Sequence, residues 1–162
     1  MVSREIRSFD YVNHPYEQVR DVLMTDASGV FRSATRAATS RAESVASELR
    51  VQLAGLEVAA TIEIQTGPIE ESPSGAGRTR TLRIPIAWKA AERPNLFPVM
   101  NAELSVYALT GTETQLDFQG HYDPPLGPLG TAIDAAVGHR IAEASVHRFV
   151  AEIAQHLRSK LD

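Results

Sequence analysis

The chain has 162 residues, 43% of them hydrophobic, which predicts one globular domain over residues 1–162 with a substantial core. Its net charge of −4 and pI of about 5.7 argue against a nucleic-acid partner, because such partners need a basic face. The absence of cysteine excludes disulfides and thiolate chemistry. Residues 1–10 lack the apolar run of a signal peptide, and no run approaches ~18 apolar residues. We therefore expect a cytoplasmic protein without a membrane span.

The first part of the chain predicts a strand followed by two short helices. Residues 5–12 have the partly alternating apolar pattern of a strand. Asn13-His14-Pro15 is typical of a helix start, since proline suits the first helical position, and this helix is expected to end near Met24. Residues 25–41 predict a second short helix, with Asp26 as a capping residue.

The pattern then changes to a period of two, which predicts an antiparallel sheet with one apolar face. Strands are expected over residues 48–53 and 56–65, joined by a turn at Ala54-Gly55. The polar segment 67–77 predicts a flexible loop. In the strand that follows it, Pro85 cannot donate a ladder hydrogen bond and therefore predicts a bulge or a sheet edge.

Two further strands complete the predicted sheet. Residues 102–108 form the first, and Gly111-Thr112 turns the chain into the second, residues 115–122. Strand parity directs Phe118 and Tyr122 to the inner, apolar face. Gly120 lies between them in the strand and predicts a close approach or a bend.

The C-terminal segment, residues 128–161, predicts one long helix. It begins after a run of proline and glycine, contains no later proline, and carries apolar residues at steps of three and four. Some 30 residues at 1.5 Å each span roughly 45 Å, enough to cross a small domain. Small residues in its first half, including Ala135, Ala136 and Gly138, favour either tight backbone packing or space for a ligand.

This element order predicts an α+β fold in which a curved antiparallel sheet of about six strands wraps around one long C-terminal helix. One helix ~10 Å wide does not fill the concavity of six strands. We therefore expect large side chains or a ligand in the remaining space.

Over essentially its whole length the chain resembles the SRPBCC superfamily, whose helix-grip fold is shared by START lipid-binding domains, birch-pollen-type allergens and polyketide cyclases. The resemblance rests on the element order, on Asn13-His14-Pro15 after the first strand, and on the passage from Leu116 to Val137. The matching positions in that passage are Tyr122, Pro124, Leu129-Gly130 and Asp134. The resemblance implies a START-like domain that binds a hydrophobic molecule between sheet and helix, and it carries over no catalytic residue.

The expected ligand-binding residues are those that would line this cavity, mostly large apolar and aromatic side chains with one cationic candidate for a polar anchor. They are Phe31, Trp88, Phe97, Met100, Phe118, Tyr122, Val137, Arg140 and Ile141.

Three polar residues fall on one face of the predicted C-terminal helix, namely His139, Glu143 and His147. The outer two lie ~12 Å apart along the helix axis, too far to share one metal ion. We expect helix-stabilising pairs here, and neither a metal site nor a cofactor.

The leading functional hypothesis is non-enzymatic binding of a small hydrophobic or amphipathic ligand, such as a lipid, an isoprenoid or a polycyclic aromatic molecule. One alternative is an enzyme of the polyketide cyclase or aromatase type, with unknown catalytic residues, which would need two convergent titratable side chains deep in the cavity. Another is a protein-interaction module whose own side chains fill the cavity. The sequence leaves the oligomeric state open, a homodimer included, and its composition leans towards a bacterial source.

Overall fold

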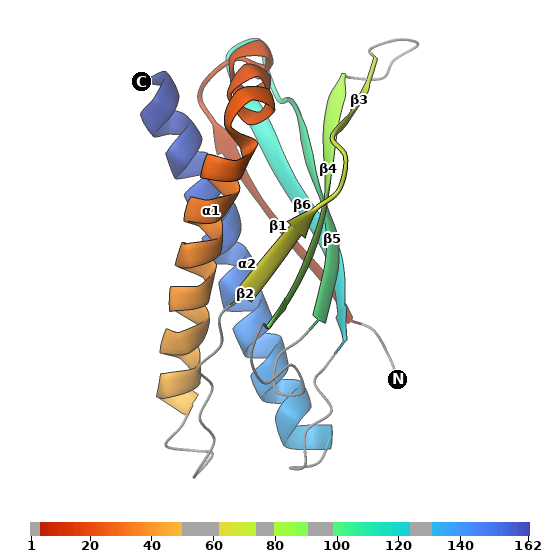
Figure 1. Cartoon of the computed structure of the whole chain (residues 1–162), viewed down its shortest axis with the longest axis vertical. Coiled ribbons are helices and arrows are strands. Elements are labelled where there is room, and N and C mark those ends of the chain that lie inside the picture. Colours follow the sequence, from red (N-terminus) through yellow and green to blue (C-terminus); the bar gives the residue numbers. More distant parts are fainter. Residues whose placement is uncertain (1–3, 50–61, 74–79, 91–98, 124–130) are drawn as a thin grey trace.

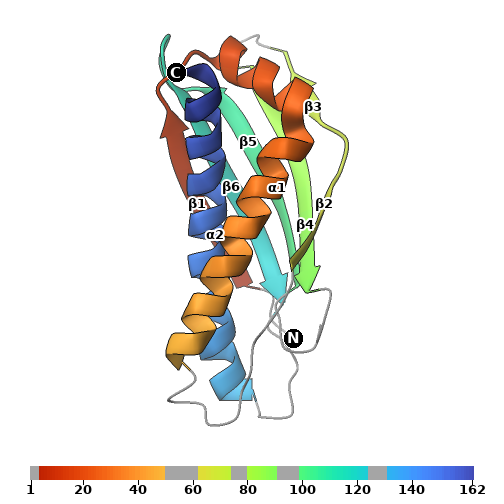
Figure 2. The same cartoon turned by 60° about the vertical axis from the view of Figure 1, so that its left-hand side comes forward.

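The structure is a computed structural model that describes residues 4–49, 62–73, 80–90, 99–123 and 131–162. Within these residues, a six-stranded antiparallel sheet carries two long helices on one face (Figures 1 and 2). The elements are β1 (Arg4–Val12), α1 (Tyr16–Leu49), β2 (Ile62–Thr66), β3 (Glu70–Ser72), β4 (Thr81–Ala90), β5 (Val99–Ala108), β6 (Thr114–Asp123) and α2 (Thr131–Leu161). The predicted α+β fold with a long C-terminal helix is confirmed.

The strands lie in the order β1-β6-β5-β4-β2, and β3 also pairs with β4. Strand β1 pairs with β6 along its whole length, from Arg4 opposite Tyr122 to Val12 opposite Thr114. Strands β5 and β6 form a hairpin that closes between Ala108 and Thr114, which confirms the turn predicted between these strands. The first and last strands along the chain are therefore neighbours in the sheet.

Pro85 lies where the partner of β4 changes. Strand β2 pairs with β4 as far as Thr66 opposite Ile86, whereas β3 begins with Glu70 opposite Arg83. Residues 67–69 thus lie opposite only two residues of β4, 84 and 85. This mismatch of three residues against two is a bulge. The Gly67 N–H donates to the Pro85 carbonyl oxygen over 2.9 Å. The prediction of a bulge or edge at Pro85 is confirmed, but the predicted loop 67–77 contains the short strand β3.

Gly120 allows a close approach between β6 and β5. A Cβ atom at this position would lie 2.7 Å from the Ala102 Cβ and 2.9 Å from the Asn101 carbonyl oxygen. Only a residue without a side chain fits there, as the sequence predicts.

Helix α1 differs most from the prediction. It runs from Tyr16 to Leu49 with a kink at Asp26, whose φ of −135° and ψ of 38° are non-helical. The expected division at Asp26 is confirmed, but the second segment does not end at residue 41, and Glu48 and Leu49 are helical rather than extended. Residues 42–49 are rich in Ala, Glu and Ser and contain no Gly or Pro, and three alternating apolar residues are too short a pattern to outweigh that helical preference. The predicted turn at Ala54-Gly55 lies outside the described residues.

Helix α2 packs mainly against α1 and β1. Its buried residues recur at steps of three and four, which confirms the second half of the predicted stripe: Ala142, Val146, Phe149, Val150, Ile153, Ala154 and Leu157. Among the described helices, none is long and apolar enough to cross a membrane.

A charged network attaches the start of α1 to the edge of the sheet. The Glu71 carboxylate on β3 accepts hydrogen bonds from the Tyr16 hydroxyl (2.7 Å), Arg20 Nε (2.5 Å) and the Arg80 guanidinium (2.9 Å). The hydrogen bonds from Arg20 and Tyr16, reinforced by Arg80, lower the pKa of Glu71 from 4.5 to about 2. Burial raises the pKa of Tyr16, and its hydrogen bond to Glu71 adds to that rise.

Candidate functional site

The two helices cover one face of the sheet, its inner face (Figure 2), and most side chains buried on that face are apolar. Alternate residues of β1, β4, β5 and β6 point inward, because side chains alternate between the two faces of a strand. The largest fully buried side chains on these strands are Leu82, Ile84, Met100, Leu104, Leu116, Phe118 and Tyr122.

Three phenylalanines fill the middle of the space between sheet and helices. The rings of Phe31 on α1 and Phe149 on α2 are stacked with centroids 6.2 Å apart. The ring of Phe118 on β6 meets that of Phe149 edge to face at 5.9 Å. These contacts hold α1, α2 and the sheet together around one aromatic cluster.

A polar group lies at the end of this interior where β6 ends and α2 begins. Tyr122 is only 1% exposed, and its hydroxyl is hydrogen-bonded to His139 Nδ1. The two rings are stacked, with centroids 6.0 Å apart and planes inclined by 25°. On its other side, His139 Nε2 lies 3.5 Å from the Glu143 carboxylate, one helical turn further along α2. A buried phenol is thus connected through an imidazole to an exposed carboxylate.

Electrostatics keep the Tyr122 phenol protonated. Burial is the main cause that raises its pKa, and Glu143 adds to the rise. The Arg4 guanidinium opposes it through its charge and a hydrogen bond, since Arg4 stands directly opposite Tyr122 in the β1–β6 pairing. In the tautomer in which the Tyr122 hydroxyl donates to His139 Nδ1, the Nε2 N–H faces the Glu143 carboxylate.

Four of the predicted lining residues lie together on the buried inner surface. They are Phe31 on α1, Met100 on β5, and Phe118 and Tyr122 on β6. Arg140 is exposed on α2, next to His139. Trp88, Val137 and Ile141 belong to β4 and α2, but their side chains are outside the described part of the chain, as is the whole of Phe97.

Arg4 is the residue that sequence reasoning missed. A charged residue near the start of the first strand carries no pattern that singles it out, and only the register with β6 brings it to Tyr122. The pairing of His139 with Glu143, by contrast, is the helix pair expected from their spacing of four residues.

A second hydroxyl–imidazole contact joins β1 to α2. Ser8, 4% exposed, has its Oγ 2.9 Å from His147 Nδ1. Among the described residues, no carboxylate lies within ion-pair distance of His147, so the pair lacks the acid that orients the base in a nucleophilic triad. The contact therefore links α2 to β1, an edge strand of the sheet. The described residues also contain no group of three side chains suited to a metal ion.

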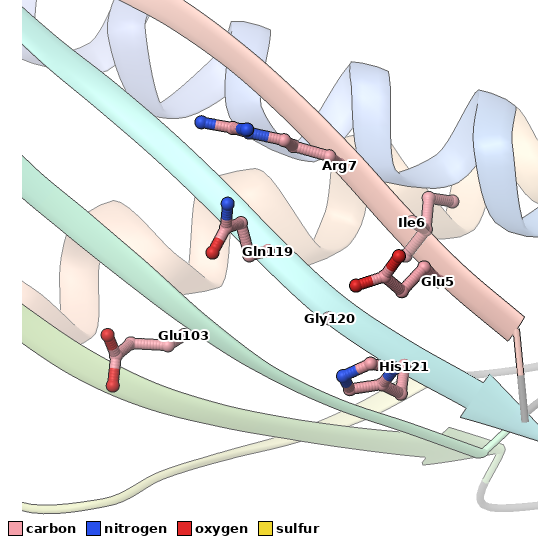
Figure 3. A pocket seen from close by; sticks show the side chains of 7 residues that line it. All are labelled: Glu5, Ile6, Arg7, Glu103, Gln119, Gly120 and His121. Atoms are coloured by element: carbon pink, nitrogen blue, oxygen red, sulfur yellow. The ribbon is translucent and has the colours of Figure 1, made fainter.

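A depression of about 470 Å³ lies on the opposite, outer face of the sheet, with the helices behind it in Figure 3. Its side chains come from β1, β5 and β6 and are mostly polar: Glu5, Ile6, Arg7, Glu103, Gln119 and His121. The Arg7 guanidinium is already held by both oxygens of Asp117, at 3.2 and 2.9 Å. A polar, open hollow does not bury an apolar ligand, so the inner face carries the candidate site.

Solved structures of similar fold share little sequence with the chain. The Zhui aromatase/cyclase from Streptomyces sp. R1128 aligns with a TM-score of 0.53 and 12% identity over 99% of this chain and 97% of that protein. A protein from Thermus thermophilus aligns with a TM-score of 0.49 and 12% identity over 98% and 100% of the two chains. For Ara h 8.0201 the TM-score is 0.42 and the identity 8%, over 98% and 99%.

The sequence matches no family model and no curated protein. At such identities the structural likeness establishes the fold, and the likeness to the Zhui aromatase/cyclase spans nearly the whole of both chains. The strand order, the antiparallel sheet and the long C-terminal helix agree with it. The chain therefore has the helix-grip fold.

Proposed function

We propose that the protein binds a small hydrophobic or amphipathic molecule between the inner face of the sheet and α2. The observation that carries the proposal is the Tyr122–His139 pair, a buried polar contact at one end of an otherwise apolar inner surface. Apolar burial supplies affinity of about 25 cal/mol per Å², and a few polar groups at one end fix the orientation of a ligand.

The ligand would lie against Met100 and Tyr122, which stand opposite each other on β5 and β6. Phe118 lies on the same inner face of β6 and continues this surface towards the aromatic cluster. We further propose that Trp88, Phe97, Val137 and Ile141 complete the lining.

The test compares the same substitution on the two faces of the sheet. Phe118 is fully buried on the inner face, whereas Phe9 is 67% exposed. Phe118→Trp should abolish binding of the neutral dye N-phenyl-1-naphthylamine, while overpacking lowers the free energy of unfolding by only about 1–3 kcal/mol. Phe9→Trp should leave both quantities unchanged.

Dye fluorescence gives the affinity, and urea unfolding gives the stability. Native mass spectrometry of gently purified protein supplies an independent test, because a resident ligand adds a mass that denaturation removes. The proposal would be refuted if Phe118→Trp lowered the free energy of dye binding and the free energy of unfolding by equal amounts. It would also be refuted if wild-type protein took up no dye.

A second candidate is acid–base catalysis of the cyclase or aromatase type. The observation that favours it is the connected series Tyr122, His139 and Glu143, since a phenol backed by an imidazole and a carboxylate can transfer a proton. Under this hypothesis, Tyr122→Phe would stop turnover of a synthetic poly-β-ketone thioester while preserving its binding. Unchanged conversion, measured by chromatography of the products, would exclude Tyr122 as the acid or base.

A further inference from the structure

Three polar side chains from three elements meet at the end of the apolar interior. Arg4 is on β1, Tyr122 on β6 and His139 on α2. Arg4 and Tyr122 are register partners, the Arg4 guanidinium opposes the rise that burial causes in the pKa of the Tyr122 hydroxyl, and that hydroxyl is hydrogen-bonded to His139. We call this group the polar end. It offers hydrogen-bond donors from a guanidinium and a phenol beside a buried apolar surface.

The polar end has a cationic component that other described residues do not neutralise. Arg4 carries a permanent charge, and in the ion pairs formed among the described residues it has no carboxylate partner. Arg7, three residues along the same strand, is by contrast held by Asp117. Glu143 is next to His139 Nε2, whereas Tyr122 contacts Nδ1 on the other side of the imidazole.

Apart from Arg4 on β1, the side chains next to Tyr122 on the inner face of the sheet are apolar. Met100, directly opposite on β5, is 1% exposed, and Phe118, on the same face of β6, is fully buried. A molecule whose charged head contacts Arg4 therefore meets the hydrophobic side chains of Met100 and Phe118 as it extends along β5 and β6.

We propose that the polar end binds the carboxylate of an amphipathic acid whose apolar tail lies along the inner face of the sheet. This inference rests on the proposed function and specifies its ligand class. A carboxylate accepts hydrogen bonds from the Arg4 guanidinium and from the Tyr122 hydroxyl. The Tyr122 hydroxyl then donates to the ligand oxygen in place of His139 Nδ1. An amine would instead be repelled by Arg4, and an alcohol of the same length would gain no ion pair.

The experiment compares two probes that differ only in the head group, dodecanoate and 1-dodecanol, at pH 7.5. Each is titrated against protein loaded with N-phenyl-1-naphthylamine. Wild-type protein should bind dodecanoate about tenfold more tightly than dodecanol, as expected for one charge-assisted contact. Arg4→Gln should lower the affinity for dodecanoate to that for dodecanol and leave dodecanol binding unchanged.

Arg7→Gln is the matched control, because Arg7 lies three residues along β1 from Arg4 and its guanidinium is held by Asp117 on the outer face of the sheet. It should retain the preference for dodecanoate. Equal binding of the two probes by wild-type protein would overturn the head-group assignment while the proposed function stands. A parallel loss of both probes in Arg4→Gln, or loss of the preference in Arg7→Gln, would also overturn it. Failure of both probes to displace the dye would overturn the proposed function as well.

Discussion

Replacing Glu71 by glutamine should destabilise the protein at neutral pH and much less in acid. Glu71 accepts hydrogen bonds from Tyr16, Arg20 and Arg80, and its pKa in the folded protein is about 2 against an ordinary value of 4.5. A group with a lowered pKa stabilises the folded state above its unfolded pKa, and this contribution is lost as the pH falls through the folded one.

The magnitude follows from the difference of about 2.5 between these two pKa values. At ~1.36 kcal/mol per unit this sets an upper limit of about 3.4 kcal/mol. The Glu71 side chain is 22% exposed, and solvent screening reduces the figure to about 2 kcal/mol at pH 7. By pH 3 more than half of this contribution is lost, which leaves a difference of under about 1 kcal/mol between wild type and variant.

Urea unfolding at pH 7 and pH 3, followed by circular dichroism, measures the two differences. Glu70→Gln is the control, because Glu70 is an exposed neighbour on the same strand, and it should change the stability little at either pH. A Glu71→Gln variant that is as stable as wild type at pH 7, or equally destabilised at both pH values, would contradict the reasoning.

Three further changes test other parts of the structure. Phe149→Ala, which removes the central ring of the aromatic cluster, should lower the free energy of unfolding by about 3–5 kcal/mol in urea denaturation. Gly120→Ala should cost about 1–3 kcal/mol, because the new Cβ would lie 2.7 Å from that of Ala102; an unchanged melting temperature would contradict this. Ser8→Ala, which removes the contact to His147, should cost about 1 kcal/mol without changing dye binding.

The sheet and the last helix could be predicted because their apolar periods are long. In β6 the inward residues Leu116, Phe118 and Tyr122 alternate with polar ones, and in α2 the stripe continues to Leu157. Such patterns specify both the element and the face that it buries. Four predicted lining residues therefore lie on the inner surface.

The departures arise where local pattern is short or absent. The predicted end of the second segment of α1 at residue 41 is wrong because a few alternating residues near Leu49 mimic a strand, whereas the helix continues to Leu49. Strand β3 has only three residues, and its formation depends on the pairing with β4. The approach of Arg4 to Tyr122 depends on register across the sheet, which no local pattern encodes.

The bulge opposite Pro85 also affects how readily this sheet edge can pair with strands of other copies of the protein. Open edges of sheets can recruit further strands, and natural proteins protect them with short or interrupted edge strands. In the described residues, the edge beside β4 consists of two pieces, five and three residues long, which are separated by the bulge. Neither piece offers the long, flat ladder that edge-to-edge aggregation requires, so the interruption favours solubility at high concentration.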